Sequence, residues 1–326
     1  MKAMVKGTGR ALPDKVLTNA ELEKMVDTTD EWIRMRTGIK ERRIATADES
    51  LSDFALPAAE RALESAGISG SEVDIIICAT VSPDMSFPAT ATLIQDRIGA
   101  RGAAAFDLSA ACTGFIYGVG IASQFLETGW ARTALVIGGE VLSKITDWTD
   151  RNTCVLFGDG AGAVVLQATE EKARGVLGVA MHSDGSLGDL ILLPGGGSLH
   201  PQSTEVLDQN LHLLKMRGNE TFKIAVRSLA EVSDEVLGQN GLKHEDVDWF
   251  IPHQANRRII DAVGQRLEIR EGRTYVNIER YGNTSAASIP IALDELNRDG
   301  QISPGDIVLL SAFGSGLTWG AGLIRW

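Results

Sequence analysis

Long apolar runs, cysteines and net positive charge are all scarce in this sequence of 326 residues. No stretch reaches the roughly 18 apolar residues of a membrane span, and the N-terminus lacks the apolar segment of a signal peptide. Three cysteines are an odd number and too few for a disulfide framework. A formal net charge of -12 disfavours a nucleic-acid or anionic-membrane surface, because both require clustered positive charge. We therefore expect a cytoplasmic protein with neither a membrane nor a nucleic-acid partner.

Signals for a metal or a dinucleotide are also missing. The four histidines His182, His200, His212 and His244 show no paired spacing typical of metal ligands. The glycine-rich segment 158–162 precedes a strand-like run instead of opening a helix after one, so it is not a dinucleotide-binding pattern. We expect no metal and no cofactor.

The periodicity of apolar residues predicts an α/β fold. Residues 52–66 and 114–127 are compatible with helices, whereas residues 73–80, 103–106, 133–138 and 163–167 are apolar runs of strand length. Helices alternating with continuous apolar strands are typical of a sheet covered on both faces. At 326 residues the chain suits two domains or one duplicated domain.

An internal repeat supports the duplication. Glu72-Val-Asp74, before one apolar strand, matches Asp246-Val-Asp248 before another at an offset of 174, and residues 134–137 match 306–309 at an offset of 172. We therefore divide the chain into halves, 1–173 and 174–326, and expect residues 182–221 to form a long loop or insertion. The strand ending at Asp107 then corresponds to an expected strand at 275–278. The turn that holds Cys112 corresponds to the turn that holds Asn283.

Cys112 is the leading candidate for a nucleophile. It lies among small residues between a predicted strand and a predicted helix, where the N–H groups of a helix start would stabilise a thiolate. His253 directly follows the strand at 249–251, and Asn283 lies on the turn equivalent to that of Cys112. Ligands of open α/β sheets bind beyond the carboxyl ends of the strands, so these three residues should converge. The alternative is that Cys112 is one more small buried residue.

Two further segments allow a functional and an ordinary interpretation. The glycine-rich end at 311–320 could let backbone N–H groups approach a reacting carbonyl, or could be a tight turn after a strand. The basic residues between positions 34 and 43 could be a solvated face or, with Trp32 as a stacking plane, a site for a phosphate-bearing ligand.

Taken together, six motifs resemble the β-ketoacyl-acyl carrier protein synthase III family over the whole length of the chain: Asp30-Glu-Trp-Ile33 with Arg36-Thr-Gly-Ile39, Ala110-Ala-Cys-Thr-Gly-Phe115, Phe157-Gly-Asp-Gly-Ala-Gly162, Pro252-His-Gln-Ala-Asn256, Gly282-Asn-Thr-Ser285 and residues 313–319. The resemblance implies a thiolase-like duplicated fold with five layers in the order α-β-α-β-α, and a homodimer. It also implies an acyltransferase that condenses an acyl-CoA primer with malonyl-acyl carrier protein through an acyl-cysteine, which starts fatty acid synthesis.

The resemblance assigns roles to individual positions. Cys112, His253 and Asn283 would be catalytic, and the backbone N–H groups of Cys112 and Ser315 would form the oxyanion hole, although many relatives have glycine where Ser315 stands. The remaining assignments are CoA binding by Thr28, Trp32, Arg36, Arg151, Asn219 and Asn256; a primer pocket formed by Phe87, Phe157 and Phe313, with Phe87 inserted from the partner subunit; and carrier-protein docking by Gln254, Arg257 and Arg258, with Lys215, Arg217, Lys223 and Arg227 as further basic candidates.

The sequence leaves the acyl group open. Primers that differ by one methylene change binding by only about 1 to 3 kcal/mol, and the pocket is built from loops. A relative on the same scaffold could use other acyl donors or acceptors, in specialised metabolism or as a 3-hydroxy-3-methylglutaryl-CoA synthase-like enzyme. A non-catalytic member and a convergent Cys-His-Asn hydrolase fit less well, because the nucleophile, histidine and amide are all present and the order of elements is not papain-like.

Overall fold

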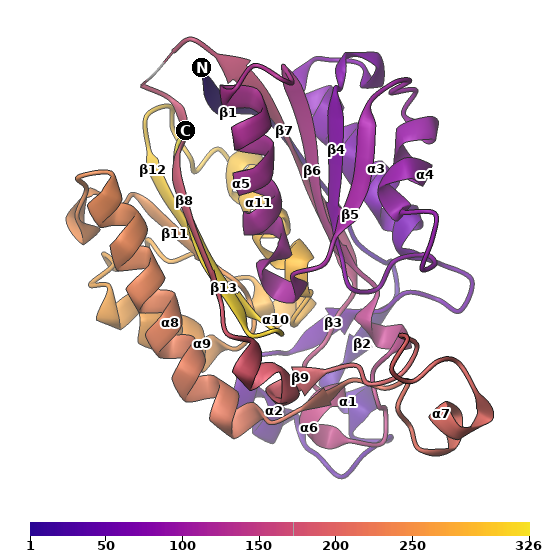
Figure 1. Cartoon of the computed structure of the whole chain (residues 1–326). Helices are drawn as coiled ribbons and strands as arrows, with labels where there is room; N and C mark the ends of the chain where they lie inside the picture. The colour runs from indigo at the N-terminus through magenta and orange to yellow at the C-terminus, as the bar shows by residue number, and fades with distance from the viewer. Residues whose placement is uncertain (172) are drawn as a thin grey trace.

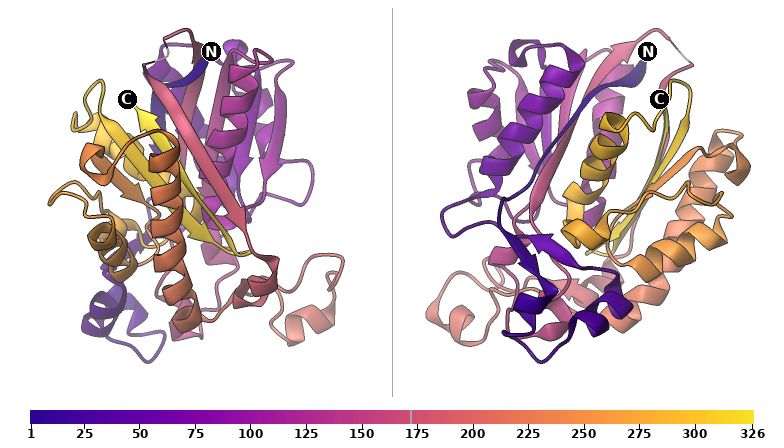
Figure 2. Two further views of the ribbon diagram at one scale, coloured as in Figure 1. Left: turned by 60° about the vertical axis from the view of Figure 1, so that its left-hand side comes forward. Right: turned by 180° about the vertical axis from the view of Figure 1, so that it is seen from behind.

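The computed structural model describes residues 1–171 and 173–326, and the side chain of Asn219 also lies outside the description. Two β-sheets are stacked with helices between them and on both outer faces (Figure 1), which gives five layers in the order α-β-α-β-α. This confirms the predicted fold. The N- and C-termini lie at the same end of the molecule (Figure 2).

The first sheet has the order β1-β7-β6-β4-β5, formed by Lys2–Ala11, Gly160–Thr169, Thr133–Glu140, Ile75–Ala79 and Ala104–Leu108. Its strand β4 pairs in parallel with β5 and β6, and every residue of β4 is buried, as the continuous apolar run predicts for a strand covered on both faces. The outer face is covered by α3 (Leu51–Ala66) and α4 (Thr90–Arg97). Helix α3 starts with a capping box between Ser50 and Asp53 and ends at Gly67, which is left-handed.

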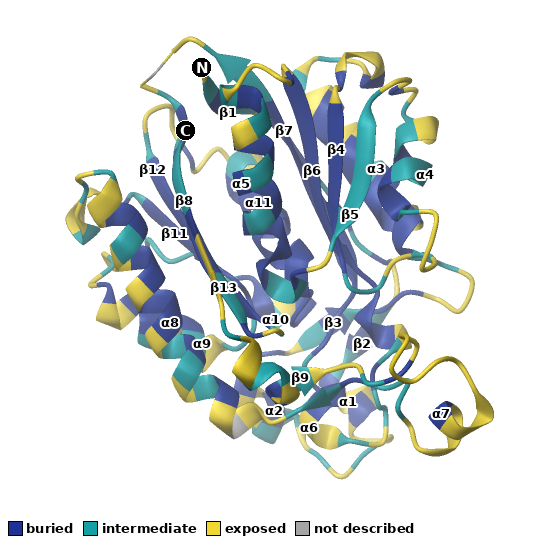
Figure 3. Cartoon of the chain, viewed as in Figure 1, coloured by how far each residue is buried: buried dark blue, intermediate teal, exposed yellow. Residues whose placement is uncertain are grey.

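The second sheet has the order β11-β12-β13-β8, formed by Trp249–Pro252, Ile307–Gly314, Thr318–Arg325 and Gly175–Ser183. Helices α8 (Gly218–Gln239) and α9 (Arg257–Arg266) lie on its outer side. Between the sheets lie α5 (Gly114–Glu127) and α11 (Ser288–Arg298). Both central helices are largely buried, whereas α7 (Thr204–Asp208) lies in an exposed loop region (Figure 3).

The two sheets repeat one topology. In the first sheet, β4 pairs in parallel with β6, and the sheet continues antiparallel to β7 and then to β1. In the second sheet, β11 pairs in parallel with β12, and the sheet continues antiparallel to β13 and then to β8. The helices α5 and α11 pack in one hydrophobic core between the sheets that both halves share, and each half has a further hydrophobic cluster of its own. The division of the chain near residue 173 stays a prediction.

The strand predicted at residues 275–278 is wrong. Only Thr274 forms a β-bridge, with Phe250, and Ile278–Tyr281 form the short helix α10. The chain leaves the sheet edge here because the side chains of Tyr275 and Tyr281 both donate hydrogen bonds to a carboxylate on α11.

The remaining elements are short and lie mainly around one end of the layered body. Residues 182–221 form mostly loop, as predicted, but bury a few apolar side chains beneath short strands. The short elements of the described chain are β2 (Val16–Thr18), α1 (Asn19–Leu22), α2 (Asp30–Thr37), β3 (Glu41–Arg43), α6 (Arg151–Cys154), β9 (Ile191–Leu192), β10 (Lys215–Met216) and the 3-10 turns η1 (Gly70–Glu72), η2 (Ala111–Thr113), η3 (Leu142–Lys144), η4 (Gly185–Leu190), η5 (His244–Asp246) and η6 (Ser285–Ala287).

Candidate active site

Cys112 lies in the turn η2, between the end of β5 and the start of α5, where the sequence placed it. Ala111, directly before it, has a φ of 45°, so the turn projects the cysteine out of the line of the chain. Gly314, at the end of β12 in the second half, packs against this turn. A Cβ atom at Gly314 would lie 2.8 Å from the backbone nitrogen of Cys112. Only glycine lets the two halves approach this closely at the thiol.

The Cys112 thiol is protonated at neutral pH. Although part of the residue reaches solvent, the surrounding protein desolvates the thiol group and raises its pKa to about 12. The Ser285 hydroxyl opposes this shift and the nearby carboxyl of Glu140 adds to it. The expected stabilisation of a thiolate by the helix start is therefore outweighed by desolvation. A nucleophilic Cys112 must lose its proton as it reacts.

His253 follows β11 and is held as a neutral ring. Burial lowers the pKa of its imidazole to about 3, and its Nδ1 lies 2.7 Å from the hydroxyl oxygen of Ser288 at the start of α11. We assign the hydroxyl of Ser288 as the donor to Nδ1, because its oxygen also accepts from the backbone N–H of Gln254 at 3.4 Å. With this assignment the ring proton lies on Nε2, which is buried with no hydrogen-bond partner among the described residues. Nε2–H is a donor aimed at whatever fills the site.

Asn283 presents the second side-chain donor. Its Oδ1 accepts the backbone N–H of Ser285 at 2.8 Å, and its own backbone bonds to Leu156 and Gly158. Because the carbonyl end of the amide is occupied, the NH₂ end is the part that remains for a ligand.

The three residues share a small set of neighbours. The turn η6, which begins with Ser285, packs against the turn η2 that holds Cys112, and the backbone N–H of Ser285 donates to Asn283. The backbone N–H of His253 donates to Ser311 at 2.8 Å, and Ser311 lies on the same strand as Gly314. The fold thus connects, through shared neighbours, three candidate site residues that the sequence places up to 171 positions apart.

Ser315 is accommodated without strain. The φ of Ser315 is not positive, so its backbone avoids the left-handed region. Its hydroxyl donates to the carbonyl oxygen of Ile191 at 2.5 Å, and its carbonyl accepts from Thr318 at 3.1 Å. The side chain is therefore anchored on β9. Its backbone N–H adjoins Gly314, the residue that touches Cys112.

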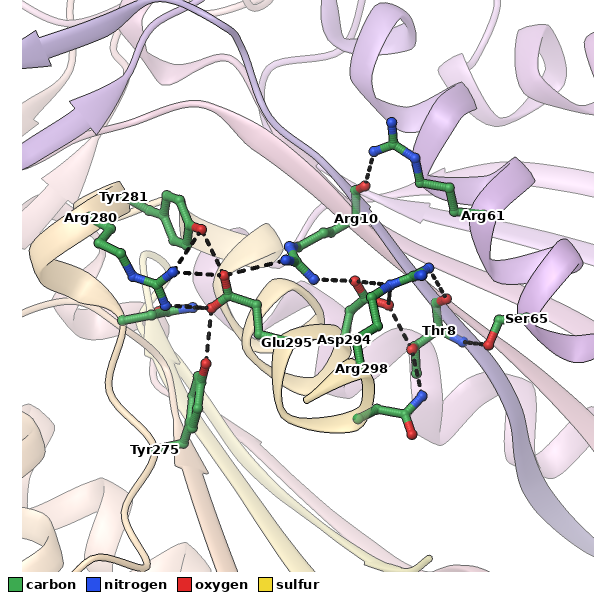
Figure 4. A network of polar contacts seen from close by, with 12 residues as sticks. Thr8, Arg10, Arg61, Ser65, Tyr275, Arg280, Tyr281, Asp294, Glu295 and Arg298 are labelled. Carbon is green, nitrogen blue, oxygen red and sulfur yellow. Dashed lines mark hydrogen bonds and ion pairs between the residues drawn. The ribbon is translucent and has the colours of Figure 1, made fainter. Parts of the chain in front are cut away.

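A buried polar network fixes α11, which carries Ser288 (Figure 4). Asp294 accepts from Thr8 at 2.7 Å and from Arg10 at 2.6 Å on β1. Glu295 accepts from four side chains around it, Tyr275, Asn277, Arg280 and Tyr281, and forms an ion pair with Arg10 at 3.6 Å. These contacts hold α11 to β1 of the first sheet and to the segment around α10, and thereby fix the partner of His253.

Five of the residues expected to bind CoA lie at the same end of the molecule. The guanidinium of Arg151 lies 5.2 Å from the centre of the Trp32 ring. The side-chain amide of Asn256 donates to the backbone carbonyl of Arg36 at 3.1 Å, and the Thr28 hydroxyl is buried with no partner among the described residues. Trp32 and Arg151, far apart in sequence, thus lie against each other, and their role in CoA binding stays a prediction.

Three predicted phenylalanines do not gather into one pocket within the chain. Phe87 is 84% exposed on the loop after β4, whereas Phe157 and Phe313 are buried in two different apolar clusters. Asn219 lies outside the residues whose side chains are described.

Gln254 is not a docking residue. It is 1% exposed, its side-chain NH₂ donates to the carbonyl oxygens of Pro252 and Tyr275, and its Oε1 accepts from the backbone N–H of Asn277. The motif placed it beside two exposed arginines, but its side chain turns inward because it ties β11 to the segment that leads into α10.

The basic residues around α8 and α9 differ in how far they are paired. Arg257 bonds to Asp261 at 2.7 Å, while Arg258 lies over the ring of Phe222 at 5.3 Å. Both arginines are exposed. Among the other candidates, Lys215 pairs with Asp147 and Arg217 pairs with Asp189. Lys223 and Arg227 are exposed on α8.

Sequence reasoning missed Glu140, Ser285 and Ser288. Glu140 ends β6, a strand buried over its whole length, and a carboxyl at the end of such a strand is the signal that could have found it. Ser285 and Ser288 follow Asn283 closely, and their roles depend on contacts that no local pattern reveals.

Comparison with known proteins defines the class. The duplicated five-layer fold with a cysteine, a histidine and an asparagine is that of a thiolase-like condensing enzyme, which is an acyltransferase. Family models for 3-oxoacyl-[acyl-carrier-protein] synthase III match residues 106–185, and those for its C-terminal part match residues 237–326.

Individual relatives agree over the whole chain. β-Ketoacyl-[acyl-carrier-protein] synthase III of Desulfitobacterium hafniense is 55% identical over 98% of this chain and 96% of its own length, and that of Caldanaerobacter subterraneus is 54% identical over 99% and 98%. The crystal structure of 3-oxoacyl-[acyl-carrier-protein] synthase III from Aquifex aeolicus has a TM-score of 0.92 at 50% identity, covering 99% of this chain and 100% of that one. The chain belongs to the β-ketoacyl-acyl carrier protein synthase III family.

None of the described helices is both long and apolar enough to cross a bilayer. No group of three or more His, Cys, Asp or Glu side chains in the described part of the chain could hold a metal ion.

Proposed function

We propose that this enzyme condenses an acyl-CoA primer with malonyl-acyl carrier protein, using Cys112, His253 and Asn283 as its catalytic residues. The observation that carries the proposal is the buried donor His253 Nε2, which has no hydrogen-bond partner among the described residues. The free thiol of Cys112 lies in the turn η2, which packs against the turn η6 that directly follows Asn283. A nucleophile next to two neutral donors suits chemistry in which a carbonyl oxygen gains negative charge.

In the first half-reaction the Cys112 sulfur attacks the thioester carbonyl of the acyl-CoA. The backbone N–H groups of Cys112 and Ser315 bind the oxyanion, CoA leaves as the thiol, and the acyl group stays on Cys112. The close packing of Gly314 on the cysteine supports this pairing of N–H groups from the two halves.

In the second half-reaction malonyl-acyl carrier protein loses CO₂. The resulting thioester enolate accepts hydrogen bonds from His253 Nε2–H and from the Asn283 amide, and its carbon attacks the acyl group on Cys112. A pKa of about 3 keeps His253 neutral at physiological pH, so it acts as a hydrogen-bond donor and not as a cation. The bond between the acyl carbon and the Cys112 sulfur breaks, the released thiolate takes up one proton from solvent, and the β-ketoacyl group leaves on the carrier protein. The reaction balances without a cofactor.

The substrates and the carrier protein have separate proposed surfaces. Trp32 and Arg151 would open to hold the CoA adenine between them, with Thr28 and Arg36 beside the nucleotide and Asn256 along the pantetheine. The exposed arginines of α9 would receive the acidic carrier protein. Both substrates belong to the cytoplasm, where we place the enzyme.

We further propose a homodimer that pairs through β5. This strand is the edge of the first sheet, with β4 as its sheet neighbour, and all five of its residues are only partly buried. An edge strand left unpaired is a liability that a second copy removes. The exposed Phe87 would close the primer pocket of the partner subunit.

A second candidate is a priming enzyme of a specialised pathway. The priming β-ketosynthase of the R1128 polyketide biosynthetic pathway has a TM-score of 0.92 and is 35% identical over 99% of this chain. It differs from the first candidate in the acyl group loaded. Acetyl, propionyl, branched and longer primers all remain candidates.

Intact mass analysis after incubation with a panel of acyl-CoAs tests the proposal. We expect one acyl adduct on the wild-type protein and none on Cys112→Ala, and the mass of the adduct identifies the primer. Absence of any adduct on the wild type would contradict the assignment of Cys112 as the nucleophile.

A further inference from the structure

The Cys112 thiol needs a proton acceptor during acylation, because its pKa of about 12 leaves it protonated at neutral pH. Neutral His253 is a poor acceptor, since burial lowers its pKa to about 3 and its Nδ1 already faces Ser288. The search for another group near the thiol leads to one buried carboxyl, which the proposed mechanism leaves unused.

That carboxyl belongs to Glu140, at the end of β6. Glu140 is 0% exposed, and within the described part of the chain no cationic side chain pairs with it. Its oxygens instead accept from four neutral donors: the hydroxyls of Ser82 at 2.5 Å, Ser285 at 3.1 Å and Thr80 at 3.3 Å, and the backbone N–H of Val81 at 3.2 Å. Four donors and no cation suit a carboxyl that changes between its ionised and protonated forms.

Ser285 connects this carboxyl to the nucleophile. Its hydroxyl donates to Glu140 Oε1 at 3.1 Å, and the turn η6 that begins with Ser285 packs against the turn η2 that holds Cys112. The same hydroxyl opposes the rise in the pKa of the Cys112 thiol. Since a hydroxyl has one proton, donating it to Glu140 leaves the serine oxygen free to accept from the thiol S–H. Ser285 and Glu140 lie in different halves of the chain, so the connection exists only where the halves meet.

We propose that Glu140 accepts the Cys112 proton through Ser285 during acylation. As sulfur attacks the acyl carbon, the thiol proton moves to Ser285 Oγ and the Ser285 proton moves to Glu140 Oε1. The new bond joins the Cys112 sulfur to the acyl carbon, and the bond from that carbon to the CoA sulfur breaks. The departing CoA thiolate takes the proton back from Glu140 along the same path, so the enzyme ends with a charged Glu140 and a neutral CoA thiol.

The titration of Glu140 falls in a useful range. Burial raises its pKa to about 7, while the donors Ser82, Val81 and Ser285 oppose the shift. The titratable groups that face it are the thiols of Cys112 and Cys78, whose pKa values it raises; Asp84 and Asp107 also act on Cys78. The acceptor must be ionised, so acylation should rise with pH through about 7.

The test compares acylation rates of Cys112 in wild type, Ser285→Ala and Glu140→Gln between pH 5.5 and 8.5, with the acyl-CoA that labels the wild type and with intact mass as readout. Ala111, at the equivalent position of the first half, has a φ of 45°, close to the 50° of Ser285, so alanine fits the turn. We expect both variants to acylate about 100-fold more slowly and to lose the rise near pH 7.

Ser82→Ala is the matched control. Ser82 also donates to Glu140 but does not connect it to Cys112. Removing this donor raises the Glu140 pKa, so the rise should move to higher pH while the rate on its plateau is kept. Enzyme acylated to completion before mixing with malonyl-acyl carrier protein should condense at the wild-type rate in all three variants.

Two results would overturn the inference. One is an unchanged pH profile in Ser285→Ala; the other is an equal slowing of acylation and condensation with a lowered melting temperature, which indicates a structural role. The inference rests on Cys112 being the nucleophile. If the wild type itself takes up no acyl group, the earlier proposal that Cys112 is the nucleophile fails, whatever the variants show.

Discussion

At the scale of single residues, His253 and Asn283 each have a side-chain N–H that the proposed mechanism directs at the substrate. In that mechanism these donors bind the enolate of the second half-reaction, so His253→Ala and Asn283→Ala should still acquire the acyl group on Cys112. Condensation with malonyl-acyl carrier protein should fall about 100-fold to 1,000-fold in each, which is the usual effect of removing one donor to a developing oxyanion. Intact mass measures the first step and single-turnover release of CO₂ measures the second.

The neutral ring of His253 leads to a prediction about how the condensation step depends on pH. His253 is neutral well above its pKa of about 3, so the condensation step should show no titration of this histidine between pH 5 and 8. Failure of His253→Ala to acylate Cys112 would instead assign the ring to the first half-reaction.

At the scale of elements, α11 depends on its buried carboxylates. Burial alone would raise the pKa of Glu295, but hydrogen bonds from Asn277 and Tyr281 and the nearby Arg280 outweigh burial and lower it. Replacing Glu295 by Gln should lower the free energy of unfolding by about 3 kcal/mol at pH 7, because Arg280 loses its buried partner. Urea unfolding measures this difference.

The sign of the pH dependence follows from that lowered pKa. A depressed carboxyl pKa stabilises the fold above the ordinary value of 4.5 and loses this effect as the pH falls through the folded value. The gap between wild type and Glu295→Gln should therefore shrink below pH 4.5. Asp299→Asn, an exposed change just after the same helix, is the control and should leave stability nearly unchanged. A gap that is constant down to pH 3 would contradict the assignment to the Glu295 charge.

At the scale of the whole molecule, a net charge of -12 must still allow an acidic carrier protein to dock. Arg258 lies over Phe222 and has no carboxylate within ion-pair distance among the described residues, whereas Arg257 is paired with Asp261. Arg258→Glu should therefore raise the KM for malonyl-acyl carrier protein more than Arg257→Glu, by roughly tenfold at low salt, and leave acyl-CoA loading unchanged.

Steady-state kinetics at two salt concentrations checks this expectation. Arg266→Glu places the same charge change at the far end of α9 and should have a smaller effect if docking is local. Equal KM values for wild type and all three variants would remove this surface from the docking site.

The sequence by itself determined the class of fold and the centre of the site. Apolar periodicity and turn chemistry are local properties, and they placed the buried strands, the central helix α5 and the turn that holds Cys112. The repeat also aligned Cys112 with the turn that holds Asn283. The shared topology of the two sheets agrees with this alignment.

Only the tertiary structure decided the ionisation states and the partners. The pKa of Cys112, the neutral His253 and the inward turn of Gln254 depend on desolvation and on hydrogen bonds between segments far apart in the chain. Glu140 and Ser285 are separated by 145 positions and meet at 3.1 Å. Periodicity carries information about which face of an element is buried, but not about which polar group it meets there, because that is set by the packing of the two halves.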